Sequence, residues 1–397
     1  MKYIDKLLQG AEVEWTTLGD TRFIEIANNN RKPVKSSNRT IGNIPYYGAN
    51  NIQDYVNGYT HNGTYILVAE DGTASVENYS IQWAVGKFWA NNHVHVLRGV
   101  GFIESRFIFH YLRTVNFIPF LTGGERAKLT KEKLQEIPIP ILCPNNPTKS
   151  LEIQRKLVEI LDKFTELEAE LEAELDCRKR QYEYYRNKLL AFDMLNTPPE
   201  KLNSINWLTI KDISKNISSG GTPRSNNATY YGGDIPWLRT QEVNFSDIWD
   251  TEVKITKEGM DASSAKYIPA NCVIIAMYGA TVGRVGINKI PLTTNQACAN
   301  IEVDENIALY RYVFHYLSSQ YEYIRSLGAG SQTNINARIV KGLKIPLPPL
   351  SEQQRIVSIL DKFDTLTSSI SEGLPKEIEL RRKQYEYYRE QLLSFRH

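Results

Sequence analysis

The chain has 397 residues, and its 47 lysines and arginines nearly balance 45 aspartates and glutamates, which leaves a net charge of +2. Hydrophobic residues make up 42% of the chain and charged residues 23%, an ordinary composition that excludes a globally disordered protein. No stretch approaches the roughly 18 uncharged apolar residues of a membrane-spanning helix, and the opening residues lack the apolar core of a signal peptide, so we expect a cytoplasmic protein of about two or three domains.

The first half of the chain predicts a mixed α/β domain followed by a long helix. The β-branched run 65–69 ends in a glycine turn and predicts a buried strand, whereas residues 107–112 predict a helix. After a proline-rich segment, apolar residues over 157–192 recur in steps of three, four and seven, which is the seam of a coiled-coil helix. Because such a narrow seam is marginal alone, this helix needs a partner.

The second half repeats this order. Residues 272–277 predict a buried strand, residues 312–317 predict a helix, and a second apolar seam runs over 356–395. Gly373 and Pro375 interrupt this seam, so we expect a kink or a non-helical break there.

An internal repeat of about 200 residues organises the chain. Segment 178–192 returns as 381–395 with ten of its fifteen positions identical. We therefore predict an α/β (α+β) fold, in which two globular domains are joined by two long antiparallel coiled-coil helices with pseudo-two-fold symmetry. The start of the chain resembles 188–190, so the two termini are expected to lie close together. The predicted parts are a first domain over 1–148, a helical spacer over 149–195, a second domain over 196–349 and a second spacer over 350–397.

No convincing catalytic constellation emerges from the sequence. It has no phosphate-binding G-x-x-x-x-G-K-[ST] loop, no histidine and cysteine cluster with metal-ligand spacing, and no C-x-x-C among its 4 cysteines. Glu252 and Lys254 could form the end of a nuclease E-x-K motif, so a metal-dependent nuclease stays one alternative. A coiled-coil scaffold without a DNA role is another.

The loops of the globular domains are rich in Arg, Lys, Asn and Gln beside Gly and Ser. Asn and Gln pair with adenine and Arg or Lys with guanine in the major groove, and the same side chains hold phosphates. Polar loops alone are a weak signal, but two related and divergent domains on matched helices suit the recognition of two short DNA sequences at a fixed distance.

Along its whole length the chain resembles the specificity subunits of type I restriction–modification enzymes. The motifs that carry the resemblance are Arg-Lys-Gln-Tyr-Glu-Tyr-Tyr-Arg at 382–389 with its copy at 179–186, Ile-Pro-Leu-Pro-Pro-Leu at 345–350, Glu352-Gln353-Gln354, Gly221-Thr222-Pro223, Gly233-Asp234-Ile235-Pro236-Trp237 and Gly279-Ala280-Thr281-Val282-Gly283. The first half departs from these patterns, with Asn28-Asn29-Asn30 and Gly72-Thr73-Ala74 instead.

The resemblance implies two target recognition domains and two helical spacers in a non-catalytic subunit. It implies assembly with two methyltransferase subunits and with restriction subunits that together methylate adenine or cut double-stranded DNA. The cofactors, S-adenosylmethionine and ATP with Mg²⁺, would then sit on the partner subunits and none on this chain. A specificity subunit of another multi-subunit methyltransferase or nuclease system is the alternative within this reading.

We expect the DNA contacts in polar loops of both domains. The candidates are Asn30, Arg31, Lys32, Lys35, Tyr46, Tyr47, Asn50, Asn91, Asn92, Arg126 and Lys128 in the first domain, and Ser219, Thr222, Arg224, Trp237, Arg239, Thr240, Gln241, Tyr278, Thr281, Arg284, Asn295, Gln296, Gln332 and Asn334 in the second.

The repeated helical segments are candidates for partner contacts, although they could also pair only with each other. The candidate residues are Arg178, Tyr182, Tyr185, Arg186, Arg381, Tyr385, Tyr388 and Arg389. The acidic stretch 166–176 is expected to form a solvated face that repels DNA.

Overall fold

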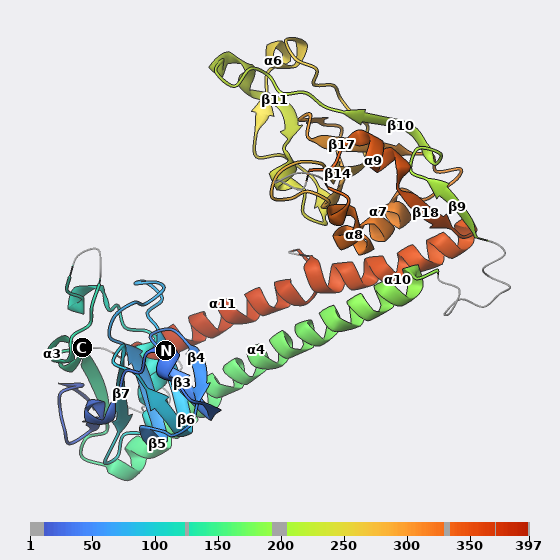
Figure 1. Ribbon diagram of the computed structural model, residues 1–397. Helices are drawn as coiled ribbons and strands as arrows, with labels where there is room; N and C mark the ends of the chain where they lie inside the picture. The colour runs from blue at the N-terminus through green and yellow to red at the C-terminus, as the bar shows by residue number, and fades with distance from the viewer. Residues whose placement is uncertain (1–11, 124–126, 193–204, 329–333, 370, 396–397) are drawn as a thin grey trace. The chain divides into compact units, whose positions relative to one another are not determined.

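The structure is a computed structural model that describes residues 12–123, 127–192, 205–328, 334–369 and 371–395 (Figure 1). It divides into two compact units, one formed by the chain up to Glu172 together with the residues from Glu377 onward, and one formed by Ala173–Lys376. Within the described residues, no helix combines the length and the apolar character that crossing a membrane requires.

The first unit is built on a six-stranded sheet and a smaller two-stranded sheet. The larger sheet has the order β2 (Ile24–Ile26), β7 (Val94–Gly99), β5 (His61–Ala69), β6 (Ile81–Ala90), β3 (Ile41–Tyr47) and β4 (Ile52–Val56). Strands β3 and β6 run parallel, and the other neighbours are antiparallel. The smaller sheet pairs β1 (Val13–Thr17) with β8 (Pro138–Leu142), and the short helices are α2 (Ser105–Leu112), α3 (Lys131–Gln135), η1 (Asn28–Asn30), η2 (Ser36–Asn38) and η3 (Ile118–Phe120).

Strand β5 is buried on both faces, which explains why its sequence is a continuous apolar run. Ile66 and Val68 belong to the core cluster that contains the residues of α2, whereas Tyr65 and Leu67 belong to a separate cluster with Phe88. Alternate residues of a strand point to opposite faces, so an unbroken apolar run is what two cores require. The strand predicted over 65–69 and the helix predicted over 107–112 are confirmed.

The second unit repeats this plan with a divided sheet. One part has the order β10 (Ser214–Ser219), β17 (Cys298–Val303), β14 (Val273–Ala276), β15 (Val285–Asn288) and β12 (Asp247–Ile248). The other has the order β13 (Lys254–Ile255), β11 (Tyr231–Leu238) and β16 (Thr293–Thr294), and β18 (Lys344–Leu347) pairs with β9 (Asn206–Thr209). The helices are α6 (Lys257–Asp261), α7 (Tyr310–Ser319), α8 (Tyr321–Ser326), α9 (Ala337–Gly342), η4 (Ala228–Tyr230) and η5 (Thr240–Glu242). The predicted strand over 272–277 and helix over 312–317 are confirmed as β14 and α7.

The long helix α4 (Pro147–Leu190) is continuous, and the second helical segment is divided into α10 (Leu350–Ser368) and α11 (Gly373–Leu393). The predicted break is therefore present. Gly373 has a φ of +75°, and a Cβ there would collide with the carbonyl oxygen of Thr365. Only glycine adopts this left-handed backbone conformation without strain, so the glycine at this position accounts for the break between the helices.

Within each unit, part of α4 packs against part of the second helical segment. In the first unit, Phe164 stacks on Tyr388 with ring centroids 5.4 Å apart, and Arg382 bonds to Glu168 at 2.7 Å, so this part of α4 and α11 run antiparallel. In the second unit, Tyr182 and Tyr185 stack on Phe363 of α10 at 6.0 and 5.6 Å.

Both ends of the described chain belong to the first unit, whereas residues 1–11, on which the expectation about the termini rests, lie outside the described residues. Val13 of β1 and Phe395, which follows α11, both pack against the core cluster that contains α2.

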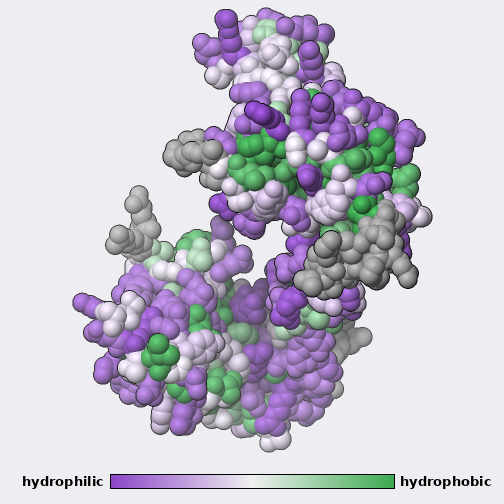
Figure 2. All heavy atoms as spheres, turned by 45° about the vertical axis from the view of Figure 1, so that its right-hand side comes forward, coloured by the Kyte–Doolittle hydropathy of each residue, from purple (hydrophilic) through white to green (hydrophobic). Residues whose placement is uncertain are grey.

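On the face drawn in Figure 2, hydrophilic side chains predominate, and apolar side chains gather only in small separate patches.

The duplication extends to a buried polar cluster in each unit. In the first unit, one carboxylate oxygen of Asp162 on α4 accepts hydrogen bonds from Arg106 Nε and from His110 Nε2 on α2, both at 2.7 Å. The other ring nitrogen of His110 lies 3.0 Å from the hydroxyl of Tyr385 on α11. This cluster ties α2 to both long helices.

The matching cluster of the second unit joins α7 to α10. Asp361 accepts hydrogen bonds from Arg311 Nη2 and from His315 Nε2, both at 2.6 Å. Here Nδ1 of His315 is buried and has no hydrogen-bond partner. The two units therefore share this framework down to single side chains, and they differ in the partners of the histidine and of the arginine, because Arg311 also donates to Asp247 at 2.7 Å.

Candidate nucleic-acid interface

In the second unit, loops from several strands are joined by backbone hydrogen bonds at one end of the sheet. The N–H of Asn295 donates to the carbonyl of Leu238 at 2.9 Å, and the N–H of Met277 donates to Ala297 at 2.8 Å. The N–H of Ile335 in turn donates to Met277 at 3.0 Å. These bonds gather the loops 238–242, 277–284, 294–297 and 334–335, which we call the strand-end loops of the second unit.

The first unit has the same three bonds. The N–H groups of Asn91, Glu70 and Leu129 donate to the carbonyls of Tyr47, His93 and Glu70 at 3.3, 2.8 and 2.7 Å. They gather 47–50, 70–74, 90–93 and 127–129, which are the strand-end loops of the first unit. Two units with one loop framework and different side chains are what the reading of two different sequences needs.

Both sets of loops contain the same turn, which shows which residues of the two units are equivalent. The side-chain oxygen of Asn91 accepts from the N–H of His93 at 2.8 Å, and that of Asn295 accepts from the N–H of Ala297 at 3.1 Å. Both asparagines were predicted to contact DNA, and the structure gives each a role in its own turn. The turn makes His93 and Ala297 equivalent positions.

The loop after the first strand of the larger sheet also matches between the units. The N–H of Lys32 donates to Ala90 at 3.0 Å, and the N–H of Gly221 donates to Thr294 at 2.9 Å, at equivalent strand ends. The counterpart of Gly221-Thr222-Pro223 is therefore the stretch that begins at Lys32. Asn28-Asn29-Asn30 does not take that place, because Lys32 makes the backbone bond that corresponds to the bond of Gly221, and the three asparagines form η1 before it.

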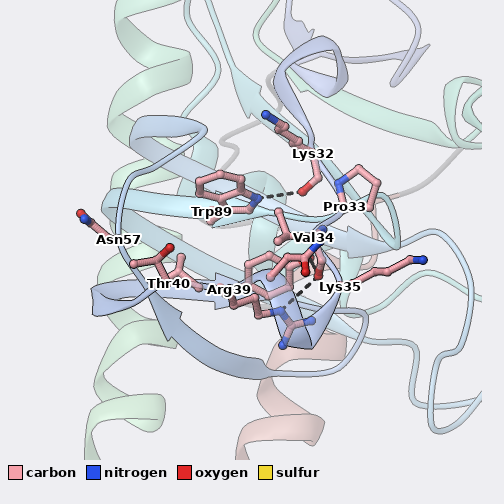
Figure 3. Close-up of a pocket in the computed structure, with 11 residues that line it drawn as sticks. Lys32, Pro33, Val34, Lys35, Arg39, Thr40, Asn57 and Trp89 are labelled. Atoms are coloured by element: carbon pink, nitrogen blue, oxygen red, sulfur yellow. Dashed lines mark hydrogen bonds between the residues drawn. The ribbon is translucent and has the colours of Figure 1, made fainter.

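A basic cavity of about 480 Å³ lies beside this loop in the first unit (Figure 3). Its lining includes Lys32, Lys35, Arg39 and Trp89 and contains no carboxylate residue. The indole N–H of Trp89 donates to the Lys32 carbonyl at 2.7 Å, and Arg39 stacks over the ring of Tyr46 at 4.2 Å. Cations beside an aromatic wall form a surface suited to phosphate and base.

A second cavity of the first unit, of about 720 Å³, opens between its strand-end loops. Its polar lining includes Asn50, Asp71, Thr73, His93 and Lys128. Asn50 holds two of the loops together, because its amide donates to the Gly72 carbonyl at 2.8 Å and accepts from the N–H of Ala74 at 2.8 Å.

The predicted DNA contacts of the first unit fall into two groups. Asn30, Lys32, Lys35, Asn50 and Asn92 are exposed. The others are engaged inside the fold: Arg31 with Glu70 at 2.6 Å, Tyr46 at 1% exposure with Val34, Asn91 in its turn, and Lys128 with Glu70 at 3.1 Å. Burial raises the pKa of Tyr47, and Arg126 lies outside the described residues.

The predicted contacts of the second unit divide in the same way. Ser219, Thr222, Arg224, Gln241, Tyr278 and Gln296 are exposed, and Thr222 hydrogen-bonds to Gln296. The engaged residues are Trp237 with Gly221, Arg239 with Glu242 and Glu252, Thr281 with the Thr240 carbonyl, Arg284 with Asn244, Asn295 in its turn, and Asn334 with Gly279. Gln332 lies outside the described residues.

The residues of the nuclease alternative are tied to other partners. Glu252 accepts from Arg239 at 2.6 Å, and Lys254 pairs with Asp250 at 3.2 Å. Across the part of the chain that the structure describes, no three His, Cys, Asp or Glu side chains are grouped to hold a metal ion. Burial raises the pKa of the Cys272 and Cys298 thiols to about 12.

The predicted partner contacts on the helices separate into seam and edge residues. Tyr385 is 2% exposed and Tyr182 is half-buried, so both belong to the seam. Tyr185 and Tyr388 lie at its edge with 36% and 41% exposure. Sequence reasoning left Tyr387 out of the candidates, although it is 59% exposed and lines a cavity with Tyr388 and Phe164 at the edge of the seam.

The edge residues form the same surface in both units. The rings of Tyr184 and Tyr185 lie 5.4 Å apart at 75°, and those of Tyr387 and Tyr388 have the same separation and angle. The remaining candidates also match between the units. Arg178 bonds to Glu174 and Gln181, and Arg381 bonds to Glu377 and Gln384 in the same way. Arg186 lies over the ring of Tyr182 and Arg389 over that of Tyr385, and the Nε of each arginine is buried without a hydrogen-bond partner. We call the surface around Tyr184 and Tyr185 and the surface around Tyr387 and Tyr388 the tyrosine edges.

Comparison with known proteins agrees with this duplicated plan. A family model described as type I restriction modification DNA specificity domain matches residues 12–176 and again 205–380. A Haemophilus influenzae type I restriction enzyme specificity subunit is 47% identical over 99% of this chain and 98% of its own length. The Escherichia coli EcoR124I/EcoR124II specificity subunit is 37% identical over 100% of this chain and 97% of its own length.

Solved structures share the fold. The S subunit of a type I restriction–modification system from M. genitalium has a TM-score of 0.62 at 14% identity and covers 98% of each chain. A chain from a structure of type I complex assembly and conformational transition has a TM-score of 0.60 at 15% identity over 96% of this chain and 97% of its own. The family model on both halves and the full-length relatives together show that this chain belongs to the specificity subunits of type I restriction–modification enzymes, which recognise DNA sequence.

Proposed function

We propose that each unit reads one half of a two-part DNA target through its strand-end loops. The observation that carries this proposal is the shared loop framework, in which the same backbone bonds hold different side chains. Bases are distinguished by side chains in the grooves, so an unchanged frame with new side chains gives a new sequence preference. Exposed residues of each set, such as Asn92 in the first unit or Gln241 and Gln296 in the second, are its base readers.

The basic cavity of the first unit holds backbone phosphate in this proposal. Lys32 and Lys35 are exposed there, and no carboxylate lines the cavity. Phosphate contacts fix the position of a protein on the duplex without reading its sequence, so these lysines contribute affinity and register.

The tyrosine edges dock two methyltransferase subunits, one on each. Exposed aromatic residues beside arginines are typical of protein interfaces. Two edges with the same internal geometry offer two equivalent docking surfaces. The assembled complex would methylate adenine and, with restriction subunits, cut DNA with ATP. S-adenosylmethionine, ATP and Mg²⁺ would be held by the partners, and this chain would supply recognition without catalysis.

The continuous helix α4 sets the distance between the two half-sites. Its 44 residues correspond to about 66 Å at about 1.5 Å per residue. Because residues of α4 belong to each unit, this proposal links the spacing of the target to the number of residues in the helix.

The test is to co-express the chain with its methyltransferase subunit and measure the mass of the complex and its affinity for DNA. We expect two methyltransferase subunits per chain and tight binding to one two-part sequence. DNA in which either half is randomised should bind about as weakly as non-specific DNA. One methyltransferase subunit at saturation, or equal binding to all sequences, would contradict the proposal.

A further inference from the structure

The second cavity of the first unit contains a histidine and an aspartate that contact each other. Nδ1 of His93 lies 2.5 Å from a carboxylate oxygen of Asp71, and both residues line the cavity. The side chains stay accessible, with 47% exposure for His93 and 36% for Asp71. The Asn91 turn fixes the backbone of His93, so the pair is held from two sides.

The aspartate determines which nitrogen of the imidazole carries the proton. An ionised carboxylate can only accept hydrogen bonds, so the proton of the neutral ring sits on Nδ1. Nε2 is then left with a lone pair, on a side chain that lines the cavity. A hydrogen-bond acceptor with a fixed position can select a donor, and in the major groove the donors are the amino groups of adenine and cytosine.

The other charged groups near this histidine are Lys128, Glu70 and Arg31, and they pair with one another, whereas Asp71 pairs with His93. Lys128 also lines the cavity, and its ammonium lies 3.1 Å from Glu70. Glu70 is bonded in addition to Arg31 at 2.6 Å, and His95 next to it is fully buried. In the second unit the equivalent position is Ala297, which has no polar side chain, so only the first unit has a histidine acceptor at this position.

We propose that His93, oriented by Asp71, is a specificity-determining residue that reads the amino group of an adenine or cytosine in the half-site of the first unit. This inference rests on the proposed function, because it requires the strand-end loops to face DNA.

The first test is the methylation motif of variants of the full complex, read by methylome sequencing. His93→Ala should leave every position of the motif intact except one, in one half-site, where adenine or cytosine gives way to mixed bases. Discrimination at that position should fall about tenfold, the size of one lost hydrogen bond. Asp71→Asn should relax the same position, since an amide can also donate to Nδ1 and no longer keeps Nε2 as the acceptor. Asn62→Ala, an exposed change near the other end of β5, is the matched control.

The second test compares affinity for the target with affinity for DNA changed at that one position. The ratio should fall about tenfold in His93→Ala and keep the wild-type value in Asn62→Ala. An unchanged motif in active His93→Ala, a guanine or thymine at the affected position, or an unchanged affinity ratio in His93→Ala would overturn the inference. Changes in both half-sites would instead show that the proposed division between units is wrong.

Discussion

The buried cluster of the second unit should depend strongly on the charge of Asp361. Asp361→Asn keeps the size of the side chain but removes the charge that Arg311 and His315 share at 2.6 Å. Arg311 retains Asp247 at 2.7 Å, so it is not left alone. Charged hydrogen bonds contribute about 1.5–3 kcal/mol each, and the side chain of Asp361 is 35% exposed, so we discount the sum and expect a loss of about 2 kcal/mol.

This loss should appear as local opening of α7 and α10, which the cluster joins. About 2 kcal/mol corresponds to a roughly 30-fold drop in protection against amide hydrogen exchange. The measurement uses the assembled complex, with the first unit as internal reference and Glu305→Gln, an exposed change in the second unit, as control. Unchanged protection of α7 and α10 would refute the role assigned to the cluster.

The same cluster predicts how stability responds to acid. Burial raises the pKa of Asp361, but the hydrogen bonds from His315 and Arg311 lower it more, so its pKa lies below the ordinary value. A carboxylate with a lowered pKa stabilises the fold above its unfolded pKa, near 3.9, and this contribution is lost as pH falls toward the folded value. The difference between wild type and Asp361→Asn should therefore be full at neutral pH and shrink below about pH 4.

Other predictions concern recognition and assembly. Lys32→Ala with Lys35→Ala should weaken binding equally for all sequences and reduce the slope of log affinity against log salt by about 1.8, measured by salt titration; a changed methylation motif would contradict this. Arg239→Ala with Gln241→Ala should alter one half-site only, and an unchanged motif would count against these loops. Insertion of four residues at Glu168 and near Ser368 adds about 6 Å of helix, so the unread gap should grow by about one or two base pairs; an active variant with the original gap would show that spacing is set elsewhere. Tyr184→Ala with Tyr185→Ala should reduce the methyltransferase content from two to one by mass measurement, and a content of two would argue against that edge.

The helices and the duplication could be read from the sequence because both are local or repeated patterns. The seam from Leu157 to Phe192 follows helical periodicity. Gly373 marks a break at which the backbone has a positive φ, an angle that favours glycine. The same periodicity, applied more strictly, separates the buried Tyr385 from the exposed Tyr387, because only the former falls on the seam steps.

The candidate site was harder to predict because its contacts join residues far apart in the chain. Whether Arg239 is available depends on Glu252, which is 13 positions away, and the role of His93 depends on Asp71, 22 positions away. Residue type marks a loop as polar without telling whether its polar groups are already satisfied inside the fold. The asparagine turns at Asn91 and Asn295 are further examples of polar side chains that serve their own loop.

The most direct test of the central claim is the methylation motif of a complex in which exposed loop residues of the second unit alone are removed. The variant replaces Arg224, Gln241, Tyr278 and Gln296 by alanine and leaves the framework bonds of the loops in place. Division of the target between the two units predicts a motif that loses definition in one half, while the other half and the gap stay as in the wild type. A motif that changes in both halves, or in neither, would contradict the account.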